Sequence, residues 1–178
     1  MRTSLILVGI ISMSLTGLVT SSTAQDVTPR VTKLFEETSY YLKDVAFIDA
    51  STGWAVGDVH WDQAQRRYTG TVIKTTDGGV TWTALDVGVT ELLNEVTFVD
   101  ATTGWAVGTG GTIVRTTDGG QSWTRQAVDT TAEFRGSAFT DTDHGWAVTT
   151  TPTTYDDFFE EYTDWDAAVW HTRDGGQS

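Results

Sequence analysis

The chain of 178 residues has no cysteine, only two prolines and only three lysines. Without cysteine the chain forms no disulfide and carries no lipid anchor on an N-terminal cysteine. An exported domain of this kind depends on its apolar core for stability. That is more typical of bacterial periplasmic or secreted proteins than of small disulfide-stapled ones.

Basic side chains are also scarce. The chain has 11 lysines and arginines against 24 aspartates and glutamates, which gives a formal net charge of −13 at pH 7. An acidic surface repels the phosphates of nucleic acids and the headgroups of anionic lipids. The composition therefore predicts no nucleic-acid partner.

Long apolar runs are limited to the N-terminus, where residues 5–19 carry no charge and follow the basic Arg2. Small residues at 22–24 then match a signal-peptidase site, so we expect a signal peptide at residues 1–24, cleaved after Ala24. The alternative is a membrane anchor, but a run of 15 residues falls short of the roughly 20 that span a bilayer. The sequence thus predicts export to the bacterial periplasm or exterior, with no integral membrane segment after cleavage.

No segment beyond residue 24 shows the 3.6-residue apolar period of an amphipathic helix. Instead the chain repeats itself. A Val-x-Phe-x-Asp string followed by Gly-Trp-Ala-Val occurs at 45–56 and 96–107, and with Ser in place of the first Val at 137–148. A second block, Thr-x-Asp-Gly-Gly-x-Ser/Thr-Trp, occurs at 75–82 and 116–123 and begins again at 172–178. Two markers give the same period, since 41 residues separate Asp77 from Asp118 and also Trp105 from Trp146.

Each period contains four short β-prone runs separated by turn residues, which in the second unit are residues 96–99, 105–108, 113–116 and 123–128. Four antiparallel strands in about 40 residues are typical of one propeller blade. We therefore predict an all-β fold in residues 25–178, a β-propeller of four-stranded antiparallel blades. About three blades are present, with repeat units at about 42–83, 93–128 and 134–178.

The second block is an Asp-box, and its residues have a local structural explanation. An Asp at a turn accepts hydrogen bonds from backbone N–H groups a few residues on, glycines supply positive φ, and the Trp covers the hairpin. A residue needed in every blade is unlike a unique catalyst or metal ligand, so we predict no catalytic residue, no metal and no cofactor. The same recurrence favours a packing role for Trp54, Trp105 and Trp146. The residues with a predicted structural role in the Asp-boxes are Thr75, Asp77, Gly79, Trp82, Thr116, Asp118, Gly120, Trp123, Thr172, Asp174 and Gly176.

The two blocks together resemble the photosystem II assembly/stability factor family of β-propellers, over residues 45–178. The sialidases, sortilins and xyloglucanases share only the Asp-box. The resemblance implies a seven-bladed, non-enzymatic propeller that binds protein partners outside the cytoplasm. Photosynthetic members of the family use basic, arginine-bearing surfaces, whereas this chain has scattered arginines and the pair Arg66 and Arg67.

A ring of six to eight blades needs roughly 250 to 330 residues at this period. We therefore expect the 178 residues to form part of a propeller, with a third blade that lacks its outer strand. Residues 31–35 precede the first unit at the place where an outer strand falls in the repeat. We expect them to pair with the last blade of a closed ring.

Two segments break the repeat. From the Gly-Trp tryptophan to the Asp-box aspartate is 13 residues in the second unit, 23 in the first and 28 in the third. The additional residues, 58–68 and 149–166, form predicted loops between the second and third strands, on the face opposite the Asp-boxes. Such loops suit a protein or cell-surface partner, with a cation site, a sugar site or a merely solvated loop as alternatives. The candidate binding residues are Trp61, Arg66, Arg67, Tyr155, Phe158, Phe159 and Trp165.

The alternative function is an Asp-box glycoside hydrolase of the sialidase or xyloglucanase kind. Such an enzyme needs two carboxyl groups about 5 to 10 Å apart across a sugar. Neighbours in sequence such as Asp156 and Asp157 do not establish that geometry. A sialidase also needs several convergent arginines, and the sequence does not assign them.

Overall fold

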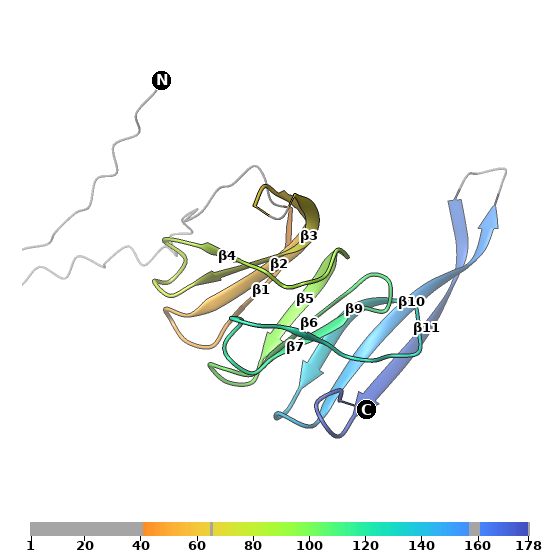
Figure 1. Ribbon diagram of the computed structural model, residues 1–178. Helices are drawn as coiled ribbons and strands as arrows, with labels where there is room; N and C mark the ends of the chain where they lie inside the picture. Colours follow the sequence, from red (N-terminus) through yellow and green to blue (C-terminus); the bar gives the residue numbers. More distant parts are fainter. Residues whose placement is uncertain (1–40, 65, 157–160, 178) are drawn as a thin grey trace, which may run out of the picture. The chain divides into compact units, whose positions relative to one another are not determined.

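A computed structural model of the chain describes residues 41–64, 66–156 and 161–177, and every regular element in these ranges is a β-strand (Figure 1). The predicted signal peptide at 1–24 and the predicted strand at 31–35 lie outside the described residues. The described ranges hold no helix of the length and apolarity that a membrane crossing requires.

The strands form three antiparallel sheets, each built from consecutive strands in chain order. The first sheet contains β1 (Leu42–Phe47), β2 (Gly53–Asp62), β3 (Arg67–Thr75) and β4 (Thr83–Leu85). The second contains β5 (Leu93–Phe98), β6 (Gly104–Gly108), β7 (Ile113–Thr116) and β8 (Thr124–Arg125). The third contains β9 (Glu133–Phe139), β10 (Gly145–Asp156) and β11 (Glu161–Thr172). The predicted all-β architecture of propeller blades is confirmed, and the third blade has three strands within the described residues.

The outer strand of the second blade is shorter than the predicted run of 123–128. β8 pairs with β7 only at Thr124 and Arg125. The Gln126 N–H still donates to the Ile113 carbonyl at 2.8 Å, but Val128 leaves the sheet and packs against the apolar cluster around Phe134 in the next blade. β8 therefore ends early, because the chain after it turns away to bury Val128 against the next blade.

The two predicted loops are instead continuous strand pairs, so their assignment as loops is wrong. In the first blade the pairing continues from Val59 opposite Gly70 to Asp62 opposite Arg67. In the third blade it continues as far as Asp156 opposite Glu161. The Thr-rich, β-branched and aromatic composition of these segments favours strands, and pairing with a neighbour satisfies their backbone groups.

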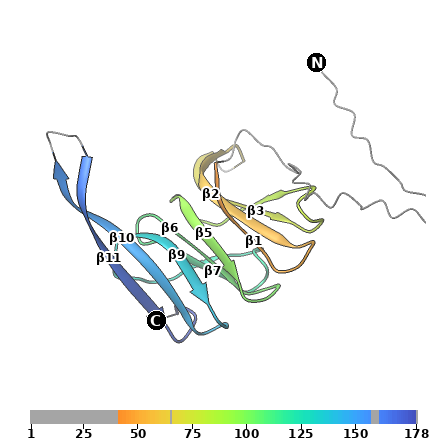
Figure 2. The same ribbon diagram turned by 180° about the vertical axis from the view of Figure 1, so that it is seen from behind.

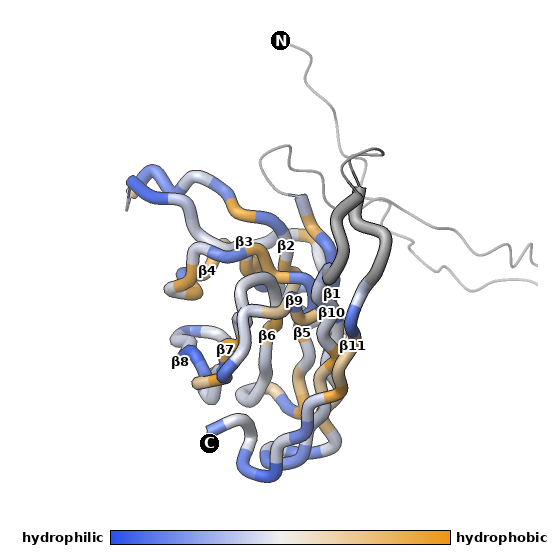
Figure 3. The backbone as a smooth tube through the Cα atoms, turned by 90° about the vertical axis from the view of Figure 1, so that its right-hand side faces the viewer, coloured by the Kyte–Doolittle hydropathy of each residue, from blue (hydrophilic) through white to orange (hydrophobic). Residues whose placement is uncertain are grey.

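The apolar core lies between neighbouring blades, and two of the repeated tryptophans are part of it. Trp54 and Trp105 are completely buried, as the sequence predicts for a packing role. Trp146 differs, because 41% of its surface is exposed. Apolar segments lie on the strands and hydrophilic segments on many of the turns (Figure 3).

The glycine before each of these tryptophans is explained by close approach of a phenylalanine. A Cβ atom on Gly104 would lie 2.5 Å from the ring of Phe98, and one on Gly145 would lie 2.2 Å from that of Phe139. Real Cβ contacts are longer than this. The phenylalanine of the Val-x-Phe-x-Asp string therefore lies over the following Gly-Trp step, and no larger residue fits there.

Candidate functional site

Backbone hydrogen bonds define two opposite ends of the blades. At one end each Asp-box turn is joined to the preceding hairpin turn, as when the Gly78 N–H donates to the Ser51 carbonyl at 2.8 Å. At the other end the β2–β3 hairpin is joined to the crossover between blades, since the Gly70 N–H donates to the Val89 carbonyl at 2.9 Å. We call these the Asp-box end and the hairpin end. The long hairpins β2–β3 and β10–β11 both extend at the hairpin end (Figures 1 and 2).

The Asp-box carboxylates are engaged in their own turns. Asp118 accepts hydrogen bonds from the Ser122 N–H at 2.9 Å, the Ser122 hydroxyl at 2.6 Å and the Thr116 hydroxyl at 2.8 Å. The Ser122 hydroxyl in particular lowers the pKa of Asp118 to about 2. Asp77 has the same arrangement, with Thr81 as its main donor. In the third box Asp174 accepts from the Thr172 hydroxyl at 2.8 Å and from the Gln177 N–H at 3.0 Å. These contacts stabilise the turns.

The remaining Asp-box residues complete the turns. The Thr75, Thr116 and Thr172 hydroxyls accept the N–H groups of Gly79, Gly120 and Gly176 at 2.8 to 2.9 Å. All three of these glycines have positive φ, from 83° to 89°. Trp82 and Trp123 each contact a phenylalanine edge to face, Phe47 and Phe98 respectively, with ring centroids 6.1 Å apart.

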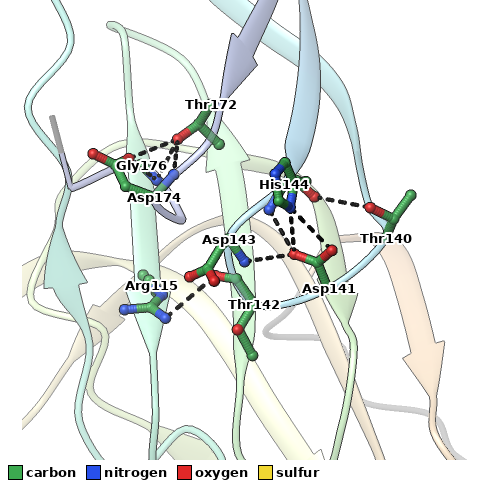
Figure 4. A network of polar contacts seen from close by, with 9 residues as sticks. All are labelled: Arg115, Thr140, Asp141, Thr142, Asp143, His144, Thr172, Asp174 and Gly176. Atoms are coloured by element: carbon green, nitrogen blue, oxygen red, sulfur yellow. Dashed lines mark hydrogen bonds and ion pairs between the residues drawn. The ribbon is translucent and has the colours of Figure 1, made fainter.

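A second set of aspartates has a structural role that the sequence analysis did not assign. Asp141 accepts the Asp143 and His144 N–H groups, both at 2.8 Å, and closes the turn between β9 and β10 (Figure 4). Asp49 and Asp100 close the corresponding turns of the other two blades. The signal was present, since the Asp that ends each Val-x-Phe-x-Asp string lies four positions before the glycine that begins the next strand.

The first long hairpin brings three predicted binding residues together. Trp61 and Tyr68 face each other across the strands with ring centroids 5.2 Å apart, and they are 44% and 59% exposed. Arg67 lies beside them and pairs with Asp86 of the crossover at 3.2 Å. Arg66 is exposed in the turn, with a φ of 54°. The hairpin thus presents an aromatic pair on paired strands, with one arginine bound to a carboxylate and one exposed in the turn.

The second long hairpin contains the other predicted binding residues. Trp165 lies opposite Pro152 in the register and is 52% exposed. Tyr155 lies opposite Tyr162. Phe158 and Phe159 lie outside the described residues.

The first strands of the three blades, β1, β5 and β9, are joined by a seam of polar contacts between blades. The Asp44 carboxylate accepts the Val96 N–H at 3.0 Å, and the Ser137 hydroxyl donates to Glu95. Burial, with a smaller contribution from the charge of Asp44, raises the pKa of Glu95 to about 7 although the hydrogen bond from Ser137 lowers it. A carboxyl group of raised pKa is a feature of general acids, yet these two groups hold neighbouring strands together. No group of three or more potential metal ligands occurs in the described part of the chain.

A recess beside Phe139, lined by Trp105, Val128 and Trp170, lies between the second and third blades. In the first two blades the Asp-box tryptophan lies next to the equivalent phenylalanine. The recess is therefore part of the blade packing, and we do not regard it as a ligand site.

Antiparallel blades of about 41 residues carry Asp-box turns, and the first two pack on the next blade through a buried Gly-Trp tryptophan. These features define an Asp-box β-propeller repeat protein. Within that class the chain belongs to the family described as "Photosynthesis system II assembly factor YCF48", whose model matches residues 75–178. The resemblance drawn from the sequence is confirmed.

Two solved structures support the fold. The chain is 26% identical to "YCF48 bound to D1 peptide", with a TM-score of 0.58 over 79% of this chain and 39% of that one. It is 22% identical to YCF48 from Cyanidioschyzon merolae, with a TM-score of 0.57 over 83% of this chain and 41% of that one. The chain therefore spans about two fifths of the length of these proteins.

The GH74 enzyme of Niastella koreensis is 10% identical, with a TM-score of 0.29 over 79% of this chain and 45% of that one. A score this low carries no argument for the hydrolase alternative. No curated protein matches the chain.

Proposed function

We propose that the chain is an exported, non-enzymatic protein-binding module of the assembly-factor kind, whose hairpin end binds a basic segment of a protein partner. The observation that carries the proposal is the exposed Trp61–Tyr68 pair on an extension of the β2–β3 hairpin, because the equivalent β6–β7 hairpin of the second blade has no such extension. Export rests on the predicted signal peptide at 1–24.

The first hairpin presents its aromatic pair on a rigid support. Four further register pairs extend the β2–β3 hairpin beyond a bulge at Gly57, and the Thr71 hydroxyl donates to the Asp58 carbonyl at its base. His60 and Thr71 are also hydrogen-bonded to each other at 3.0 Å. Binding costs less when side chains are held in place beforehand, and one good aromatic anchor contributes about 2 kcal/mol or more.

The charge of the chain favours a basic partner. At a net charge of −13, association with a basic segment is accelerated at low ionic strength and weakened by salt. One family member has been solved as YCF48 bound to D1 peptide, which supports a polypeptide as the class of ligand.

A binding role without chemistry is supported by the state of the carboxylates. Those of the Asp-boxes and of the first turns accept hydrogen bonds from their own turns, and those of the inner seam join neighbouring strands. A glycosidase needs a pair that faces a substrate instead.

A capture experiment tests the proposal. The exported protein is used to capture partners from its own cell envelope, beside a double variant Trp61→Ala, Tyr68→Ala and the control Val80→Ala. Val80 is 65% exposed in an Asp-box turn at the other end of the blades. We expect the double variant to recover roughly tenfold less of a specific partner, and Val80→Ala to recover as much as the unmodified protein.

Trp165→Ala, tested alone, reports on the second hairpin, and we expect a smaller loss there. Unfolding curves of all variants show whether a loss of capture is a loss of folding. Equal recovery by the double variant would refute the site, and sugar release from envelope glycans by the unmodified protein would favour the hydrolase alternative.

A further inference from the structure

The two sides of the β2–β3 hairpin differ in what they face. Side chains along a strand alternate between the two faces of the sheet, and residues opposite each other in the register share a face. Val56 and Val72 are opposite each other, and both belong to the apolar cluster between the first and second blades. Their side of the hairpin is therefore the side that faces the second blade.

The Trp61–Tyr68 pair lies on this second-blade side. The bulge of the hairpin is on β2, so β3 alternates regularly and Gly70 and Tyr68 share the side of Val72. Trp61 lies opposite Tyr68. A Cβ atom on Gly70 would lie 2.7 Å from the Glu91 carbonyl oxygen, in the crossover that leads into the second blade, which gives the same direction. The blade that the pair faces is part of the described chain, so the pair is exposed beside a neighbour that is already in place.

The second blade is too short to cover the pair. Its β6–β7 pairing ends at Val107 opposite Ile113, whereas the β2–β3 pairing continues for four register pairs past the bulge. Trp61 and Tyr68 consequently remain exposed above the hairpin end of the second blade.

The same side of the blades carries a recurring contact between a tryptophan and a cation. Lys74 is opposite Trp54 in the register, and its ammonium lies 4.9 Å from the ring centroid. Arg115 is opposite Trp105, and its guanidinium lies 5.5 Å from that centroid. A cation over an indole ring is attracted by the negative face of the π system. Each of the first two blades therefore supplies a cation to its own repeated tryptophan.

Trp61 has a ring opposite it instead of a cation. Its cross-strand neighbour is Tyr68, and the two rings meet edge to face at an interplanar angle of 72°. Both rings are accessible to solvent, so a cation that belongs to another molecule can reach them.

The charge around the pair favours such a cation. Residues 58–68 and 86–92 hold four carboxylates against the two arginines Arg66 and Arg67. Arg67 pairs with Asp86 at 3.2 Å, and Arg125 of β8 pairs with Glu91 at 2.9 Å. Negative charge is still in excess when Arg125 is counted, so the surface attracts a basic side chain and repels an acidic one.

We infer that the Trp61–Tyr68 pair binds a lysine or arginine side chain of the partner through a cation–π contact, above the hairpin end of the second blade. The partner's cation takes the role toward Trp61 that Lys74 has toward Trp54. This inference rests on the proposed function and deepens it, because it names the group that the hairpin recognises.

A double-mutant cycle with two labelled probe peptides tests the inference by fluorescence anisotropy. In one peptide arginine alternates with glycine, and in the other citrulline, a neutral isostere, replaces each arginine. The proteins are the unmodified exported chain, the variant Trp61→Leu and the control Val80→Ala. We expect the preference for arginine over citrulline to be roughly two- to fivefold greater in the unmodified chain and in Val80→Ala than in Trp61→Leu.

The comparison isolates the π system. Leucine keeps an apolar side chain at position 61, and neither replacement changes the charge of the protein, so general attraction to an acidic surface cancels. Far-ultraviolet circular dichroism shows whether Trp61→Leu is folded, and Tyr68→Leu gives the same comparison from the other ring.

Equal preference in the unmodified chain and in both leucine variants would overturn the inference, as would no binding of the arginine peptide to the unmodified chain. The capture experiment decides the proposed function separately. Loss of the partner in the double alanine variant, together with equal peptide preference, would leave a hairpin that binds its partner by apolar contact alone. Equal capture would refute the proposed function whatever the peptides show.

Discussion

Replacing Trp105 with alanine is expected to lower the free energy of unfolding by about 3 to 5 kcal/mol. The side chain is completely buried, stacks on Phe139 at 3.6 Å and donates to the Gly175 carbonyl at 3.0 Å. Its removal leaves a cavity between two blades and also deprives that carbonyl of a donor. Urea unfolding followed by circular dichroism measures the loss.

The matched control for this prediction is Trp146→Ala, because it makes the same chemical change at the same repeat position. Trp146 is 41% exposed, so the cost should be well under half of that at Trp105. Equal losses at the two positions would contradict the assignment of the internal blade interface as the core.

Stability is expected to fall as pH rises from about 4.5 to about 7, on the order of 2 to 3 kcal/mol from Glu95 alone. Burial raises the pKa of this carboxyl to about 7, from 4.5 in the unfolded chain. Between these values the folded state holds a proton that the unfolded state has lost. The stabilisation is therefore complete below about pH 4.5 and is lost as pH passes through the folded-state value.

Two groups face the Glu95 carboxyl from the strands packed against it. From β1 the Asp44 carboxylate faces it, and from β9 the Ser137 hydroxyl donates to it. The other charged groups of these strands have other partners, since Lys43 bonds to Asn94 and Arg135 pairs with Glu133. The lowered pKa values of the turn aspartates, about 2 for Asp77, give an opposite dependence, with stability lost as pH falls below about 4.

Glu95→Gln should flatten the decline between pH 4.5 and 7, because the amide keeps the shape of the side chain without a charge. Urea midpoints at several pH values, with Asp129→Asn as an exposed-carboxylate control, provide the measurement. An unchanged slope in Glu95→Gln would show that another group causes the decline.

Much of the fold could be predicted from the sequence because each blade repeats the same local solution. The Gly-Trp step, the Asp-box and the 41-residue spacing are local patterns, and each has a local physical cause. The direction of packing between blades could not be predicted in this way. It depends on which phenylalanine each tryptophan reaches, and Trp54 reaches Phe98, 44 positions further along the chain.

The candidate site was only partly predictable for the same reason. Its location at 58–68 and 149–166 followed from subtracting the repeat, but the segments were expected to be loops and are strands. Cross-strand pairing places Trp61 opposite Tyr68, and no periodic pattern in the sequence predicts that register. The seam at Glu95 was missed altogether, because its burial arises from contact with two other blades.

Site-specific photo-crosslinking in the intact cell tests the central claim, that the hairpin end is the partner-binding surface, most directly. A photoreactive residue replaces Gln63, exposed near the tip of the first hairpin, or Val80, exposed in the Asp-box turn at the opposite end. Neither replacement removes Trp61 or Tyr68. The account predicts a discrete crosslinked partner from position 63 and none from position 80. Crosslinking of that partner from position 80, with none from position 63, would contradict it.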